Sequence, residues 1–155
     1  MMERDDFHAI LALLRTYAAH NDEGRWHEAA ALFTEDARFT RPSDPHKPIV
    51  GREAILQSFL ARPKGPRRHH LVANPVVERI DGDTARARCY SVLLTELGES
   101  QGNVTVGGFD DVLARTDAGW RFCSRTGFTL FDPLPFTAQH GAPWPLPAAA
   151  QSESS

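Results

Sequence analysis

One carboxylate and a pair of histidines are the residues of this sequence whose types best suit acid–base chemistry. Asp22 comes near the end of a predicted helix, at the edge of its apolar face. A carboxylate in that place opposes the helix macrodipole and, if it is also removed from water, holds its proton more tightly. Such a group suits general acid or general base catalysis. The alternative is that Asp22 simply caps the helix predicted to follow it, in RWHEAAALF.

His69 and His70 are adjacent in a predicted strand, so their side chains point to opposite faces of the sheet. One imidazole therefore faces the interior if the strand is an inner one, and imidazole titrates near neutral pH. The alternative is a histidine at the start of a strand that bonds to backbone or solvent. Tyr17 is the first candidate for polarising an oxygen of a substrate. Further residues expected to orient a ligand or to form the wall of a pocket are Asn21, Trp26, Phe33, Phe39, Phe59, Asn74, Ser91, Phe109 and Trp120.

The sequence carries no recognisable motif for a metal, a phosphate or a dinucleotide. A metal site from His20, Asp22 and a strand histidine is chemically possible, but a ligand motif such as HExxH is missing, so we expect neither a metal nor a cofactor. The Gly107-Gly108 pair lies inside a predicted strand and predicts a bulge. In the segment GGFDDVL one of the two aspartates faces the interior, and an ion pair with Arg121 or Arg125 would account for either.

Two predicted helices meet at Asp22. Apolar residues recur at helical spacing from about residue 6 to residue 22, and Asp5 or Asp6 can cap the start. Gly24 breaks this helix, and a shorter one begins near Arg25. A short strand is predicted at 37–40, a surface loop in RPSDPHKP, and a third helix in GREAILQSFLARP.

After the third helix the hydrophobic period changes to two. Four strands are predicted, joined by DGD, GESQGN and TDAG, at 69–80, 84–97, 104–115 and 120–131. Three helices followed by antiparallel strands predict an α+β fold. We expect one domain over 1–132 and a Pro-, Ala- and Ser-rich tail over 133–155, whose Phe136, Trp144 and Leu146 either dock on a surface or stay disordered.

The composition of the chain limits the classes of partner that it is expected to bind. With 155 residues, 41% of them hydrophobic and 24% charged, the chain has the size of one globular domain. A net charge of -3, from 17 basic and 20 acidic residues that are well mixed, argues against binding nucleic acid or a membrane surface. The amino terminus lacks an apolar signal core, so we expect a cytoplasmic protein. Cys89 and Cys123 are expected to be reduced thiols inside strands.

Several phrases of the sequence occur in an order that resembles a known family. They are Tyr17-Ala18 followed by Asp22, then ALFTEDA, GREAI, RHHLVAN, DGDTA and GWRF. Together they resemble the SnoaL-like group of the nuclear transport factor 2-like superfamily, which includes polyketide cyclases and scytalone-type dehydratases. The resemblance covers about residues 6 to 131. It implies a curved sheet wrapped around helices as a cone with an apolar cavity, in a homodimer that pairs through the outer face of the sheet.

The resemblance also implies roles for single residues. It makes His70 the inward histidine, and in the dehydratases an aspartate at the position of Asp22 hydrogen-bonds a catalytic histidine. The second catalytic histidine of that family would fall near Thr95, but 84–97 contains no histidine. Asp22 must then pair with His70 itself, or the chemistry differs. Asn21 also departs from the tyrosine or aliphatic residue of the family.

The leading hypothesis is a cofactor-independent acid–base enzyme that acts on a small, largely apolar, oxygenated molecule by dehydration, isomerisation or cyclisation. Asp22, His70 and Tyr17 would carry the reaction. One alternative is a non-catalytic protein that binds a hydrophobic ligand. Another is a structural subunit, because the small subunits of aromatic-ring dioxygenases share this cone. The fold hosts all three, so function must be argued from the site.

Overall fold

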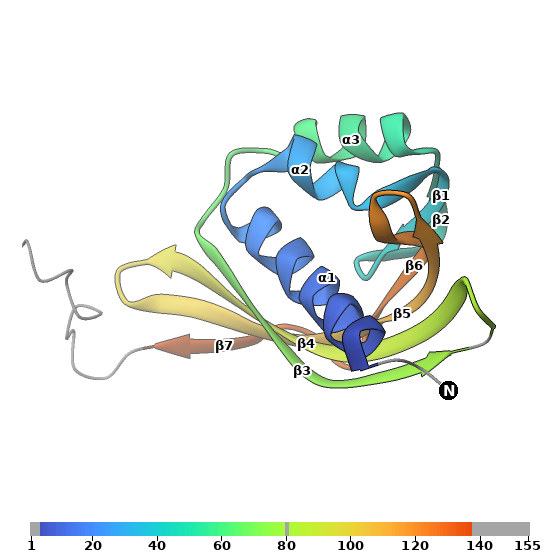
Figure 1. Ribbon diagram of the computed structural model, residues 1–155. Coiled ribbons are helices and arrows are strands. Elements are labelled where there is room, and N and C mark those ends of the chain that lie inside the picture. Colours follow the sequence, from blue (N-terminus) through green and yellow to red (C-terminus); the bar gives the residue numbers. More distant parts are fainter. Residues whose placement is uncertain (1–3, 80, 138–155) are drawn as a thin grey trace, which may run out of the picture.

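Three helices cover one face of a curved, seven-stranded sheet in the computed structural model, which describes residues 4–79 and 81–137 (Figure 1). The helices are α1 (Arg4–Asp22), α2 (Trp26–Ala31) and α3 (Arg52–Leu60). The strands are β1 (Phe33–Arg41), β2 (Asp44–Val50), β3 (Arg68–Arg79), β4 (Thr84–Gly98), β5 (Gln101–Thr116), β6 (Gly119–Thr129) and β7 (Leu134–Thr137). The predicted α+β class, with three helices on a curved sheet, is confirmed.

The sheet is open and mixed. Its strands run in the order β2-β1-β6-β5-β4-β3, and all neighbours are antiparallel except β1 and β6, which are parallel. In Figure 1 α1 lies along the concave side of β3 to β6, while α2 and α3 lie over the end that holds β1. The carboxyl end of α1 therefore lies near the connection from α3 to β3.

The prediction of a surface loop in RPSDPHKP is wrong. Asp44–Val50 forms β2, which pairs with β1 through Phe39 opposite Ile49. This strand is an edge of the sheet, where proline is tolerated because one side of the backbone needs no ladder hydrogen bonds. All its side chains except Ile49 are exposed, so the apolar alternation that marks a half-buried strand is missing from the sequence.

The segment predicted as a tail contributes a strand at its start. Leu134–Thr137 forms β7, which pairs with the first residues of β5. Gly102 of β5 lies under the Phe136 ring, where a Cβ atom would collide with it. Trp144 and Leu146 lie outside the described residues.

The core lies between α1 and the inner face of the sheet. Along β4, Ala85, Ala87 and Cys89 are buried while Arg86 and Arg88 are exposed, which is the alternation expected of a strand with one buried face. Around Tyr17 of α1 stand the rings of Phe33, Phe39, Phe59, Phe109 and Phe122, with centroids 5.8 to 6.4 Å away. No helix in the described residues is long and apolar enough to cross a membrane.

Candidate functional site

Asp22 and His70 are in direct contact. The Asp22 Oδ1 atom contacts His70 Nδ1, and Asp22 Oδ2 accepts a hydrogen bond of 2.8 Å from the His70 backbone N–H. One carboxylate thus holds both the main chain and the ring of the histidine. The side chains are 20% and 22% exposed, so the pair is shielded but still reaches solvent.

Local structure explains why the carboxylate is available. Asp22 is the last residue of α1, and the chain then turns through Gly24 at a φ of 68°, a conformation that favours glycine. The N-cap of α2 is Arg25, and no side chain makes a capping hydrogen bond there. Asp22 therefore does not cap the second helix, and both of its oxygens turn to β3 instead.

The strand register turns His70 toward the helices. In the ladder of β3 and β4, His70 lies opposite Leu93. Val72, which is two residues after His70 and therefore on the same face, lies opposite the buried Ser91. His69 points to the other face, where its Nε2 atom lies 3.4 Å from the Glu96 carboxylate and both side chains are more than half exposed. Of the two adjacent histidines, His70 is the one that contacts α1.

The contact determines what the imidazole can do. A carboxylate beside Nδ1 favours the tautomer in which Nδ1 carries the hydrogen and Nε2 carries the lone pair. Within the described part of the chain, Nε2 of His70 has no hydrogen-bond partner. A nitrogen arranged in this way can take up a proton, and the Asp22 carboxylate then stabilises the imidazolium.

Tyr17 lies one helical turn before this pair, with its ring buried. Its side chain is 5% exposed, and the Arg125 guanidinium lies 4.3 Å from the ring centroid. Its hydroxyl interacts with Arg62, whose pKa is lowered from its usual value by burial and is partly restored by Tyr17. Tyr17 thus reaches from the aromatic core toward the surface at the carboxyl end of α1.

Arg62 is a member of this group that sequence reasoning missed. Its Nη1 atom donates a hydrogen bond of 2.7 Å to Asn21 Oδ1, and Asn21 Nδ2 donates one of 2.9 Å to the Tyr17 carbonyl. The guanidinium lies 5.1 Å from the Trp26 ring centroid and 4.6 Å from that of Phe59. The residue lies just after α3, within the segment predicted as the third helix, but it is not one of the apolar residues at helical spacing, so no pattern in the sequence identifies it.

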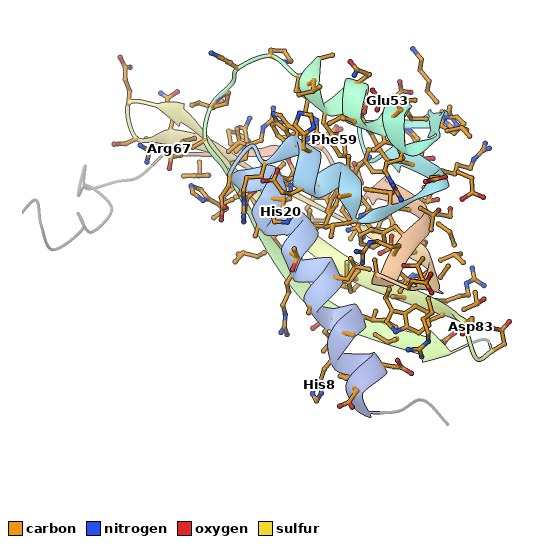
Figure 2. The ribbon with its side chains drawn as sticks, turned by 45° about the horizontal axis from the view of Figure 1, so that its top comes forward. His8, His20, Glu53, Phe59, Arg67 and Asp83 are labelled. Carbon is orange, nitrogen blue, oxygen red and sulfur yellow. The ribbon has the colours of Figure 1, made fainter. Side chains whose placement is uncertain are left out.

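Hydrogen bonds and ring contacts hold these residues together at the carboxyl end of α1. Figure 2 shows His20, in the last turn of α1, on the same side as Phe59 of α3 and Arg67 of the α3–β3 connection, with His8 at the other end of the helix. We call Tyr17, Asn21, Asp22, Arg62 and His70 the rim group. Trp26 and Phe59 form its aromatic support.

A second pair, of a carboxylate and a guanidinium, lies deeper in the fold. Asp111 of β5 and Arg125 of β6 are opposite each other on the inner face, with Arg125 Nη1 2.7 Å from Asp111 Oδ2. Their side chains are 0% and 1% exposed. Burial raises the pKa of Asp111 to about 7, although Arg125 acts in the opposite direction. Arg125 also lies 3.8 Å from the Phe109 ring centroid.

The side chains of Asp110 and Asp111 thus point to opposite faces of the sheet, as the alternation predicts. Asp110 lies on the outer face and pairs with Arg88, whereas Asp111 pairs with Arg125, one of the two arginines expected. In the described ranges, Asp111 Oδ1 and Arg125 Nε are buried without a hydrogen-bond partner. The pair is buried beneath the ring of Tyr17, a member of the rim group that Arg125 contacts.

The remaining candidates lie elsewhere. Trp120 is buried near the other end of α1, where its Nε1 atom donates a 3.1 Å hydrogen bond to Asp6, 16 residues or about 24 Å of helix away from Asp22. Asn74 is exposed at a bulge of β3, with a φ of 47°. Ser91 is buried on the inner face of β4. Phe33, Phe39 and Phe109 are buried members of the aromatic core.

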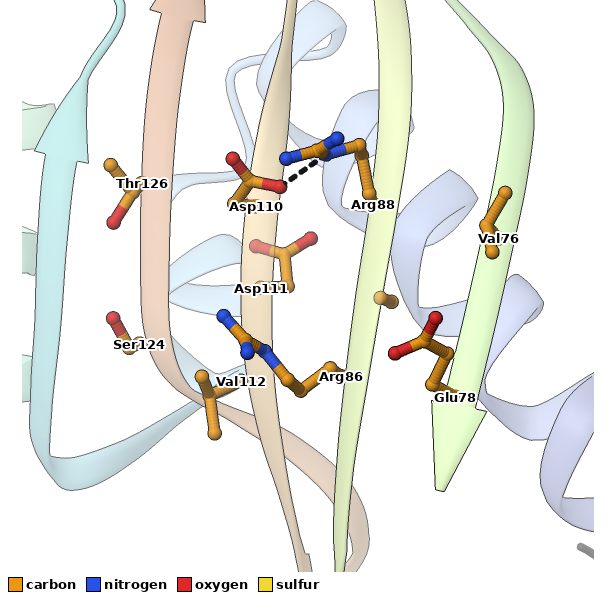
Figure 3. Close-up of a pocket in the computed structure, with 10 residues that line it drawn as sticks. Val76, Glu78, Arg86, Arg88, Asp110, Asp111, Val112, Ser124 and Thr126 are labelled. Atoms are coloured by element: carbon orange, nitrogen blue, oxygen red, sulfur yellow. Dashed lines mark hydrogen bonds and ion pairs between the residues drawn. The ribbon is translucent and has the colours of Figure 1, made fainter. Parts of the chain in front are cut away.

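A hollow of about 480 Å³ lies on the outer face of the sheet, away from the rim group. Figure 3 shows its lining, with Arg88 and Asp110 joined across β4 and β5. Glu78, Arg86, Ser124 and Thr126 line it as well. Neither Asp22 nor His70 is among the residues that line it, so we place the candidate chemistry at the rim group.

In residues 4–79 and 81–137, no three His, Cys, Asp or Glu side chains come together as ligands for a metal ion. His20, considered as a ligand together with Asp22, has its Nδ1 atom buried without a partner in those ranges. Burial and the neighbouring Arg25 lower the pKa of His20.

Comparison with known proteins places this chain in a family. A model of the SnoaL-like domain matches residues 2–126. The chain belongs to the SnoaL-like family. No curated protein sequence matches the chain.

Solved structures share the fold of this SnoaL-like protein. A proposed aromatic ring hydroxylase from Novosphingobium aromaticivorans superposes with a TM-score of 0.77 at 25% identity, over 88% of this chain and 96% of that one. A nuclear transport factor 2-like protein with a cystatin-like fold, from the same organism, gives 0.70 at 25% identity, over 81% and 82% of the two chains. A proposed scytalone dehydratase from that organism gives 0.72 at 21% identity, over 85% and 87%, and shows the fold alone.

Proposed function

We propose that this SnoaL-like protein is a cofactor-independent acid–base enzyme for a small, largely apolar, oxygenated molecule, with Asp22 and His70 as the proton-transfer pair. The observation that carries the proposal is the double contact of one carboxylate with the ring and the backbone of one histidine. Dehydration, isomerisation and cyclisation all begin with removal of a proton next to a carbonyl. The neighbour described as a scytalone dehydratase is consistent with this class.

In a dehydration, His70 Nε2 would take the proton from the carbon beside the carbonyl, and the electron pair of that C–H bond would form the enolate. The imidazolium, stabilised by Asp22, would return the proton to the β-hydroxyl group, which leaves as water when the enolate collapses. The Tyr17 hydroxyl would donate to the carbonyl oxygen while negative charge develops there. In an isomerisation, the imidazolium would return the proton to a different carbon.

Deuterium exchange tests this proposal without knowledge of the natural substrate. Small cyclic ketones and β-hydroxyketones are incubated with the protein in D₂O, and NMR follows exchange beside the carbonyl and loss of the hydroxyl. We expect catalysed exchange that falls by about 10²- to 10⁴-fold in His70→Ala. His69→Ala is the matched control, because that imidazole lies on the opposite face. Equal exchange in wild type and His70→Ala would contradict the proposal.

A protein that only binds a hydrophobic ligand is the second candidate. It is favoured by the hydrogen bond from the His70 backbone N–H to Asp22, because a tie of that kind also fastens β3 to α1 without any chemistry. Ligand binding that survives in His70→Ala, together with no exchange of any ketone in wild type, would support this candidate over the enzyme.

For the assembly we propose a homodimer through the outer face of the sheet. Apolar side chains stand exposed there beside the hollow, among them Leu71 at 56%, Val76 at 57% and Tyr90 at 41%. Val76→Glu should therefore shift the protein toward the monomer in sedimentation velocity. Val50→Glu is the control, because Val50 is equally exposed but lies on the edge strand β2. A monomer in wild type would overturn this assignment.

A further inference from the structure

Three arginines lie near one another at the rim without a carboxylate partner. Arg41 and Arg68 are close enough to Arg62 that their charges lower its pKa further, after burial as the main cause. In the described part of the chain, none of the three forms an ion pair. Arg41 Nη2 donates to the Ser58 carbonyl at 2.6 Å, and its Nε atom is buried without a hydrogen-bond partner among the described residues.

In the described part of the chain, the groups that the Arg62 guanidinium contacts directly are neutral. One N–H of its guanidinium goes to the amide oxygen of Asn21, the Tyr17 hydroxyl lies beside it, and the rings of Trp26 and Phe59 flank it. Removing a cation from water is costly unless an opposite charge compensates it. The only nearby carboxylate of the rim group, Asp22, already has both oxygens engaged by His70. The positive charge is therefore left for an anion from outside.

The position of this charge links it to the proposed chemistry. Asn21, which holds Arg62, directly precedes Asp22, which holds His70, so the guanidinium and the imidazole flank the carboxyl end of α1. A guanidinium has five N–H donors in a planar fork, which matches the two oxygens of a carboxylate. The flat ring of Trp26, which is partly exposed, offers apolar surface to the ligand beside that charge, while the Phe59 ring is buried beside the guanidinium.

We propose that Arg62 is an anion-binding residue of the rim group, and that the ligand is a small aromatic or cyclic molecule that carries a carboxylate. The inference rests on the proposed function for the location of the reacting carbon beside His70. Arg62 itself is a specificity residue, which selects the acid form of a ligand over its neutral analogues. Asn21 positions Arg62 through its amide oxygen.

Binding of matched acid and amide pairs tests the inference. Benzoate, naphthoate and cyclohexanecarboxylate are compared with their primary amides by isothermal titration calorimetry, at low salt because screening weakens the charge. At least one acid should bind about 10- to 100-fold more tightly than its amide, as expected for hydrogen bonds to a charged group. In Arg62→Gln this preference for the acid over the amide should disappear, and Arg62→Lys should restore it in part.

Arg67→Gln is the matched control, because it removes the same charge from an exposed side chain five residues further along the same connection. It should keep the preference for the acid. Equal binding of acids and amides, no binding by any acid, or equal loss in Arg62→Gln and Arg67→Gln would overturn the inference. Because binding is measured at equilibrium, a preference that depends on Arg62 in a protein without exchange activity would refute only the proposed catalysis.

Discussion

Two pairs of an acidic and a basic side chain, one at the rim and one in the core, differ in burial and in the elements that they join. Asp22 and His70 lie at the rim, with side chains 20% and 22% exposed. Asp111 and Arg125 lie in the core, with side chains 0% and 1% exposed. The rim pair joins a helix to a strand, whereas the core pair joins two neighbouring strands.

The difference indicates which pair can exchange protons with a ligand. Histidine changes its charge near neutral pH and at the rim can do so against a bound molecule. Arginine stays charged, and the rings of Tyr17, Phe109 and Phe122 cover it. The pKa of the Asp111 carboxyl is raised mainly by burial, with a smaller contribution from the charge of Asp110, and no ligand is needed to explain it. A shifted pKa therefore indicates function only where a ligand can approach.

Removing the buried cation should produce the largest loss of stability. In Arg125→Met, Asp111 loses its partner in a site that water does not reach, so above pH 7 the free energy of unfolding should fall by about 3–5 kcal/mol. The loss should be smaller at pH 5, where the carboxyl carries a proton. Urea denaturation followed by circular dichroism measures both values.

Arg88→Met is the control for this variant, because Arg88 pairs with Asp110 on the exposed face of the same sheet. It should change the unfolding free energy far less, since exposed ion pairs contribute little. Similar losses of unfolding free energy in the two variants would show that the buried pair contributes no more to stability than the exposed pair.

The same pair should make stability depend on pH. Burial raises the pKa of Asp111 from 3.8 to about 7 in the folded protein, so the fold keeps a proton that the unfolded chain releases. This contribution is fully present below the unfolded pKa and is lost as pH rises through the folded pKa. Between pH 4 and pH 7 it should decline by on the order of 1 kcal/mol per pH unit.

Asp111→Asn isolates this contribution, because an amide of nearly the same shape does not titrate. The difference in unfolding free energy between Asp111→Asn and wild type should move in favour of the variant as pH rises to about 7, and then level off. Urea denaturation at a series of pH values measures it. A difference that does not change with pH would show that Asp111 has an ordinary pKa.

The rim carboxylate should contribute less to stability and more to activity. Asp22→Asn keeps one acceptor for His70 but loses the charge, so we expect a fall of about 1–2 kcal/mol in unfolding free energy. The rate of deuterium exchange of ketones should fall by much more than this loss of stability would explain, because the imidazolium loses its counter-charge. Thermal melts and the NMR exchange assay, run on the same preparation, compare the two effects.

Much of the fold could be predicted from the sequence because local patterns determine it. The period of 3.6 in α1 and the alternation of β4 follow directly from which residues are apolar. β2 could not be predicted, since an exposed edge strand with two prolines has no alternation to detect. β7 stayed hidden in a proline-rich segment for the same reason.

The site, too, could be predicted from the sequence only in part. Asp22 and the pair His69-His70 were singled out from their types and positions, and the family resemblance selected His70. The contact between Asp22 and His70 joins residues 48 positions apart and depends on how β3 crosses α1. The partner of Asp111 could be narrowed to two arginines by alternation, and register then selects Arg125. Arg62 could not be found, because it is a polar residue at the end of the segment predicted as the third helix, and its contact with Asn21 joins residues 41 positions apart.

The tautomer of His70 tests most directly whether Asp22 prepares this imidazole for proton transfer. Long-range ¹H–¹⁵N NMR spectra of the histidine rings, recorded above pH 8 and assigned with His70→Ala, report which nitrogen carries the hydrogen. The account predicts that the neutral His70 ring carries its hydrogen on Nδ1, against Asp22, and that Asp22→Asn shifts the ring toward a mixture of tautomers. A neutral His70 with its hydrogen on Nε2 would leave no basic nitrogen free for a ligand and would contradict the account.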